Sequence, residues 1–76
     1  MEITNPDIMR ERQALGARIR KLRLDQGISQ RKLATMIGAN HSTLGLIEAG
    51  TANFKYDKLE KIADALGVSV KTLFDY

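Results

Sequence analysis

Apolar residues recur along the chain at the three- and four-residue spacing of helices, and turn signals divide them into five segments. The first segment begins at Asn5-Pro6, where a capping residue precedes a proline at the first helical position, and it ends at Gly27. Its apolar stripe is Ile8, Leu15, Ile19 and Leu22. No stretch alternates apolar and polar residues for long enough to form a strand. The pattern therefore predicts an all-α fold.

The four later segments are shorter, and each is bounded by a capping residue, a glycine or both. The boundaries are Ser29 and Gly38 for the second, Asn40 and Gly50 for the third, Gly67 at the end of the fourth, and Ser69 at the start of the fifth. The positions expected to face inward share helical spacing, and they are Leu33, Ala34, Ile37, Leu44, Ile47, Leu59, Ile62, Ala63, Leu66 and Leu73.

Composition narrows the function classes. Seventy-six residues make one domain, and with no cysteine and a single histidine we expect no disulfide, no metal site and no cofactor. No nucleophile, base and orienting group can be assembled, so we do not expect an enzyme. The start of the chain has neither a basic stretch nor an apolar run, and no segment has the roughly 18 apolar residues of a membrane span. A soluble, cytoplasmic protein without a membrane partner is expected.

Charge is distributed unevenly along the chain, although the net charge is only +3. Residues 10–32 hold eight basic residues against two acidic ones, whereas residues 33–76 hold four against five. A basic segment of this kind favours a polyanionic partner. It is equally compatible with a solvated helix face, so charge alone leaves both interpretations open.

The stretch from Ser29 to Gly50 has the spacing of a helix-turn-helix. Only Gly38-Ala39-Asn40 separates its two helices, which must therefore cross steeply. Gly38 suits the left-handed conformation that ends a helix, and Ala34 is small where the helices must approach closely. If the apolar residues close one core, the outward face of the second helix of the pair carries His41, Ser42, Gly45 and Leu46.

On these residues the sequence resembles the phage-repressor/Cro-type helix-turn-helix family, also called the XRE family. The matching positions cover about residues 15–74, and they include Leu15-Gly16, Leu22-Arg23, Ile28-Ser29-Gln30, Leu33-Ala34, Ile37-Gly38, Ser42-Thr43-Leu44, Ile47-Glu48-Ala49-Gly50, Leu59, Ile62-Ala63 and Leu66-Gly67-Val68. The resemblance implies a five-helix, lambda-repressor-like domain over residues 15–76, with its motif at about 29–50. Residues 1–14 would form an N-terminal extension and the start of the first helix.

The resemblance further implies a transcriptional regulator, a repressor or autoregulator, that binds double-stranded operator DNA as a homodimer. Positions that face bases in the family are occupied here by Asn40, His41, Ser42, Gly45 and Leu46, and those that touch phosphates by Gln30, Arg31, Thr43 and Asn53. Each has an ordinary alternative, such as a plain surface role for His41 or capping of the fourth helix by Asn53. Because this face holds no Arg or Lys, DNA shape is expected to carry more of the specificity.

Two further roles follow from the resemblance. Arg23 and Glu48 occupy positions that form an ion pair between the first and third helices, the alternative being two solvated charges. At the chain end, Val70, Phe74 and Tyr76 exceed the apolar area that one short helix needs, and they are predicted to form a dimer interface. The alternative is that Phe74 folds back onto the first helix.

Two rival functions share the same fold. One is a protein-interaction module, such as the antitoxin of a toxin–antitoxin pair with a co-encoded protein partner. The chain has no separate tail for neutralising a toxin, which makes the antitoxin interpretation less favoured without excluding it. The other, a controller of a restriction–modification operon, is a narrower form of the DNA-binding interpretation.

Overall fold

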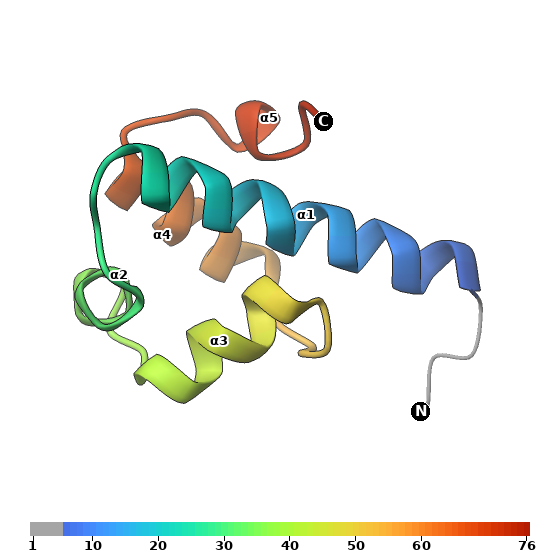
Figure 1. Cartoon of the computed structure of the whole chain (residues 1–76), viewed down its shortest axis with the longest axis horizontal. Helices are drawn as coiled ribbons and strands as arrows, with labels where there is room; N and C mark the ends of the chain where they lie inside the picture. Colours follow the sequence, from blue (N-terminus) through green and yellow to red (C-terminus); the bar gives the residue numbers. More distant parts are fainter. Residues whose placement is uncertain (1–5) are drawn as a thin grey trace.

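The computed structural model describes residues 6–76, and within them the backbone forms five helices and no strand. These are α1 (Pro6–Asp25), α2 (Gln30–Met36), α3 (His41–Ala49), α4 (Tyr56–Leu66) and α5 (Val70–Leu73). In Figure 1, α1 crosses the view, with α5 above it, α2 and α3 below it and α4 behind it. The all-α fold predicted from the apolar spacing is confirmed.

Local capping chemistry sets most of the helix boundaries. The side chains of Ser29, Asn40 and Ser69 accept hydrogen bonds from backbone N–H groups three residues later, at 3.0, 2.8 and 3.2 Å. α4 differs, because its N-cap is Lys55, which makes no side-chain capping bond. Asn53 therefore does not cap α4. The remaining predicted cap, Asn5, lies outside the described residues.

One core joins all five helices. Its buried members are the predicted inward positions of the four later helices together with Leu15 and Ile19 of α1. Ile8 was expected in the same stripe but is 43% exposed. The first turns of α1 extend past the other helices (Figure 1), so the apolar stripe continues beyond the elements that would cover it.

Two glycines allow the backbones of α1 and α3 to come close together. A Cβ atom on Gly16 would lie 2.8 Å from the carbonyl carbon of Glu48, and closer still to the carbonyl oxygens of Ile47 and Glu48. Gly50, in the left-handed conformation at φ 77°, would place a Cβ 2.6 Å from the Cα of Gln13. The end of α3 is thus held directly against the backbone of α1.

Candidate nucleic-acid interface

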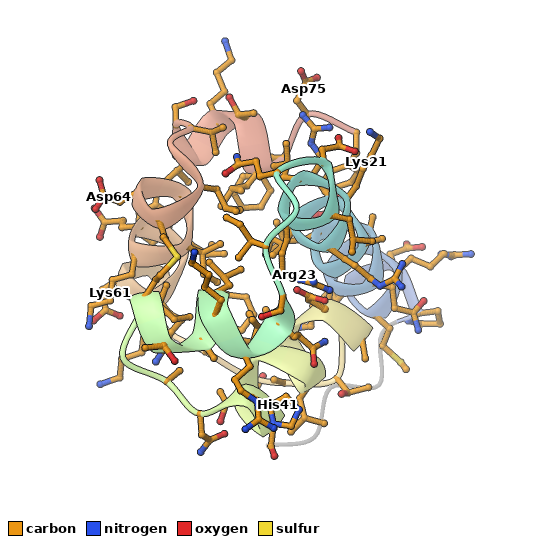
Figure 2. The ribbon with its side chains drawn as sticks, turned by 60° about the vertical axis from the view of Figure 1, so that its left-hand side comes forward. Lys21, Arg23, His41, Lys61, Asp64 and Asp75 are labelled. Carbon is orange, nitrogen blue, oxygen red and sulfur yellow. The ribbon has the colours of Figure 1, made fainter. Side chains whose placement is uncertain are left out.

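The turn between α2 and α3 leaves the start of α3 at the surface. Gly38 has a φ of 70°, and the Ala39 N–H donates to the carbonyl of Ala34 at 2.9 Å, which closes the end of α2. The chain then enters α3 at His41, which Figure 2 shows at the lower edge of the molecule. His41 and Ser42 are both exposed. The first turn of α3 is therefore accessible along one edge of the domain.

The five residues predicted to face bases do not share one environment. Asn40, His41, Ser42 and Leu46 are exposed, Leu46 to 53%. The Oδ1 atom of Asn40 accepts from the Thr43 N–H, and its amide nitrogen carries two N–H groups that can donate to a ligand. Gly45 is half-buried, because the Gln30 side-chain amide lies over it, 3.5 Å from where a Cβ would sit. Gly45 thus lies at the boundary with α2 rather than on the open face.

The predicted phosphate contacts are also spread over several elements. Arg31 is exposed in the first turn of α2, and Asn53 is exposed in the segment between α3 and α4. Thr43 is half-buried on α3. Gln30, also half-buried, uses its Nε2 to donate to the Glu48 carboxylate at 3.1 Å. The structure therefore places Gln30 and Arg31 at the start of α2, with the Gln30 side chain against Gly45 and Glu48 of α3.

Arg23 and Glu48 form a buried ion pair between α1 and α3. Arg23 Nε donates to Glu48 Oε2 at 2.7 Å and Nη2 donates to Oε1 at 2.9 Å, while the two side chains are 7% and 3% exposed. Arg23 Nη1 also donates to the carbonyl of Ile28 at 2.9 Å. The hydrogen bond from Glu48 raises the pKa of Arg23 above its ordinary value. This pair fixes the end of α3 to α1 and to Ile28 in the turn before α2.

The basic segment 10–32 does not form one surface. Arg23 is neutralised in the core, Lys21 pairs with Asp25 at 2.8 Å, Arg10 pairs with Asp7, and Arg18 donates to the carbonyl of Thr72 at 3.2 Å. Lys21 lies at the opposite edge of the molecule from His41 (Figure 2). A charge sum along the chain could not reveal this, because it does not distinguish the faces of a helix. Arg31 and Lys32 are both exposed in the first turn of α2.

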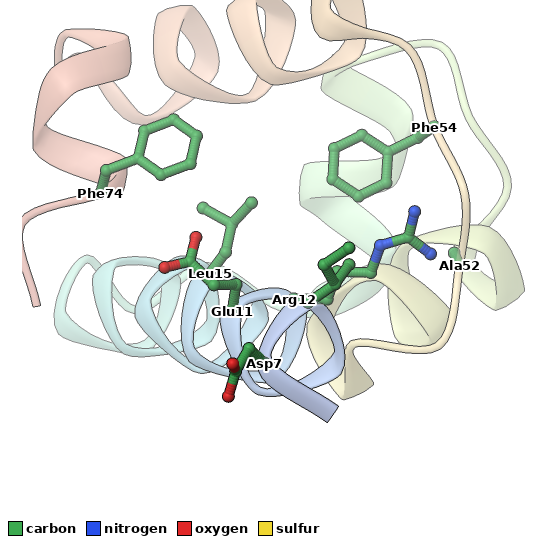
Figure 3. Close-up of a pocket in the computed structure, with 8 residues that line it drawn as sticks. Asp7, Glu11, Arg12, Leu15, Ala52, Phe54 and Phe74 are labelled. Atoms are coloured by element: carbon green, nitrogen blue, oxygen red, sulfur yellow. The ribbon is translucent and has the colours of Figure 1, made fainter. Parts of the chain in front are cut away.

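Of the residues predicted to form a dimer interface, Phe74 lines an apolar cleft of about 510 Å³ beside α1. Figure 3 shows Phe54 and Phe74 pointing toward each other above α1, with Leu15 between them and Glu11 and Arg12 along the rim. Phe74 is 44% exposed, so it is not part of the buried core, although it lies over α1 at the edge of the cleft. Val70 is half-buried against the core, while Tyr76 is exposed beside Ala14 and Ala17 of α1. Although Tyr76 is 57% exposed, its partial desolvation, and then the charge of Glu11, raise its pKa.

Sequence reasoning missed two features of this region. The hydrogen bond between Gln30 and Glu48 joins a surface residue to the core ion pair. Gly16 is required by the distance between α1 and α3. The signal for the hydrogen bond was a carboxylate, Glu48, next to the core residue Ile47. The signal for the close approach at Gly16 was a glycine inside a long helix.

Two other kinds of feature, a membrane span and a cluster of metal ligands, are not found in residues 6–76. Within residues 6–76, no helix combines the length and the apolar character needed to cross a bilayer. Over the same range, the His, Asp and Glu side chains form no group of three or more that could hold a metal ion. The exposed start of α3 and the apolar cleft beside α1 are the features that remain to be explained.

Comparison with known proteins assigns the fold to a family. A family model for helix-turn-helix domains, HTH_3, matches residues 19–73. The control protein C.BamHI of Bacillus amyloliquefaciens is 40% identical over 62 residues, which span 80% of this chain and 76% of C.BamHI. The crystal structure of the restriction-modification controller protein C.AhdI from Aeromonas hydrophila matches with a TM-score of 0.85 at 34% identity, covering 90% of this chain and 99% of C.AhdI.

A longer protein shares the same domain. The HTH-type transcriptional regulator PuuR of Escherichia coli is 33% identical over 61 residues, which span 80% of this chain but only 33% of PuuR. The resemblance to the Cro-type helix-turn-helix family is thus confirmed by a family model, by sequence relatives and by a solved structure. The chain belongs to the HTH_3 helix-turn-helix family, whose members are DNA-binding regulators.

Proposed function

We propose that this protein regulates transcription by binding double-stranded operator DNA in a sequence-specific manner, with α3 in the major groove. The observation that carries the proposal is the start of α3, where Asn40, His41 and Ser42 are exposed on a helix anchored to α1 through the buried ion pair. In helix-turn-helix proteins the first residues of the recognition helix meet base edges. A rigid helix with an open first turn meets that geometric requirement.

Readout by α3 depends on neutral polar and apolar groups. A ring N–H of His41 can donate to a purine N7 or to guanine O6, and the Ser42 hydroxyl can donate or accept. Leu46 is positioned to meet a thymine methyl group. Because no Arg or Lys lies on this face, bidentate guanine contacts are absent from the proposal and DNA shape contributes to specificity.

Phosphate contacts fix the register of the protein on the duplex. Arg31 supplies a charge at the start of α2, and Gln30, Thr43 and Asn53 supply neutral donors around α3. We assign the protein no catalytic activity, and we place it in the cytoplasm on chromosomal or phage DNA.

The active form in this proposal is a homodimer that pairs through the chain end. Exposed Phe74 lines the apolar cleft together with Ile8 and Phe54, exposed Tyr76 lies next to α1, and Val70 packs against the core. Two-fold pairing of this surface buries the same residues on both copies. Such symmetry spaces two recognition helices about 34 Å apart, which is one turn of DNA.

A narrower form of the proposal is control of a restriction–modification operon. It is favoured by the extent of the matches, since C.BamHI is covered over 76% of its length and C.AhdI over 99%. The match to PuuR covers only one domain of a longer protein. The rival function, an antitoxin, has no comparable observation in its favour.

The test is selection of bound sequences from random duplex DNA, followed by footprinting of the selected duplex. The expected result is a palindromic motif with half-sites about 10 base pairs apart, centre to centre. The motif should also occur upstream of restriction–modification genes next to the gene for this protein. If no sequence is enriched, specific DNA binding is refuted, and co-purification with a co-encoded protein would then favour the antitoxin.

A further inference from the structure

Gln30 links the surface of the proposed interface to the buried ion pair. Its side-chain amide lies between two residues of α3: Nε2 donates to Glu48 Oε1 at 3.1 Å, and Oε1 lies 3.5 Å from where a Cβ of Gly45 would sit. Gln30 itself is half-buried at the first position of α2. One side chain therefore connects the start of α2, the middle of α3 and the core.

The chemistry of Glu48 determines which way this amide points. An ionised carboxylate only accepts hydrogen bonds, so the nitrogen of the Gln30 amide must face it and the oxygen must face away. Both oxygens of Glu48 are in turn held by Arg23, at 2.7 and 2.9 Å. Within residues 6–76 no buried side-chain polar atom lacks a partner, so the carboxylate is fully satisfied in this position. Rotating the amide by 180° would bring its oxygen against the carboxylate.

Gly45 provides the space for this arrangement. A methyl group at that position would make only an ordinary contact with the amide at 3.5 Å, so a small residue here leaves room for the Gln30 amide.

We propose that Glu48 is a positioning residue for DNA recognition, which holds the Gln30 amide so that one N–H group points in a fixed direction at the junction of α2 and α3. The inference rests on the DNA-binding function proposed above. One N–H of Nε2 is used by Glu48, and the other is left for a phosphate oxygen. The orientation is established before DNA arrives, so no rotamer freedom of Gln30 is lost on binding.

The first test is a double-mutant cycle measured by DNA affinity. Gln30→Met removes the amide and leaves a side chain of similar volume. The double variant Arg23→Met/Glu48→Met removes the carboxylate and replaces the ion pair with apolar side chains. Apolar replacement of a buried ion pair is often neutral or stabilising, so the double variant is expected to fold. Gln30→Met should weaken operator binding about tenfold in the natural background, the scale of one hydrogen bond to a charged group, and about twofold or less in the apolar background.

A matched control is Gln26→Met, because the Gln26 side chain donates to the carbonyl of Leu66 at 2.6 Å rather than to Glu48. Its effect on DNA affinity should be the same in both backgrounds. If Gln30→Met has the same effect in both backgrounds, the positioning role is refuted although DNA binding stands. If the natural protein binds no duplex, the proposed function itself has failed.

The second test needs no DNA and does not depend on the double variant. Nitrogen-15 relaxation of the three glutamine side-chain amides compares Gln30 with Gln26, which is hydrogen-bonded, and with Gln13, which is exposed. The Gln30 amide should be as ordered as that of Gln26. A Gln30 amide as mobile as that of Gln13 would overturn the proposal. If the double variant does not fold, this relaxation measurement is sufficient to test the positioning role.

Discussion

Substituting alanine for two helical glycines should change stability in opposite directions. Gly16 and Gly45 both lie inside helices, where Gly→Ala stabilises by about 0.5–1 kcal/mol because the unfolded chain loses freedom. The two sites differ only in what the new methyl group meets. At Gly45 it meets the Gln30 amide at 3.5 Å, which is an ordinary contact.

At Gly16 the methyl group would meet the backbone of α3. It would lie 2.8 Å from the carbonyl carbon of Glu48, and these backbone atoms cannot rotate away as the end of a side chain can. α1 must then move away from α3, which loosens the packing around Leu15 and Ile19. Such overpacking costs about 1–3 kcal/mol and outweighs the helix gain, leaving a net loss of about 1–2 kcal/mol.

Thermal unfolding followed by circular dichroism measures both effects. In a domain of this size 1 kcal/mol shifts the melting temperature by about 4–8 °C. Gly16→Ala should therefore lower it by roughly 5–15 °C, and Gly45→Ala should raise it by a few degrees. If Gly16→Ala melts at the natural temperature or above it, α1 and α3 are not as close as the structure has them.

Three further predictions concern single side chains. Glu48→Ala leaves Arg23 buried without its partner and should lower the free energy of unfolding in urea by about 3–5 kcal/mol. The control, Glu60→Ala at an exposed residue, should change it by less than about 0.5 kcal/mol, and equal effects would contradict a buried pair. Asn40→Ala removes the α3 cap and should cost about 1 kcal/mol, and a variant of unchanged stability would show that the bond to Thr43 contributes nothing. Phe74→Ala should give a folded monomer in analytical ultracentrifugation, so a variant that stays dimeric or unfolds would refute its place in the interface.

Local rules explain why the helices could be predicted from the sequence. Caps and glycine stops act within a few residues, so Ser29, Asn40 and Ser69 were recognisable without any tertiary information. The core positions followed because helical spacing identifies the buried face. α4 is the exception, since its start at Lys55 carries no side-chain cap that a pattern could reveal.

Features that depend on how helices meet could not be predicted in the same way. The exposure of Ile8 reflects how far α1 extends past its neighbours, and the spread of the basic segment reflects which face each residue occupies. The positions of Arg23 and Glu48 came from family resemblance, but the hydrogen bond from Gln30 to Glu48 required coordinates. The site was thus predicted as a set of positions, whereas its internal connections needed the structure.

The most direct test of sequence-specific DNA binding by α3 compares the natural protein with His41→Ala/Ser42→Ala on a selected duplex and on a scrambled one. Affinity is measured at 50 and 200 mM salt, between which 6–10 neutralised phosphates weaken binding roughly 10³–10⁵-fold. We predict that the natural protein prefers the selected duplex at both salt concentrations. The variant should lose about 1–3 kcal/mol for each base contact on that duplex while keeping its affinity for the scrambled one and its salt dependence. A variant that discriminates as well as the natural protein would show that another element reads the sequence.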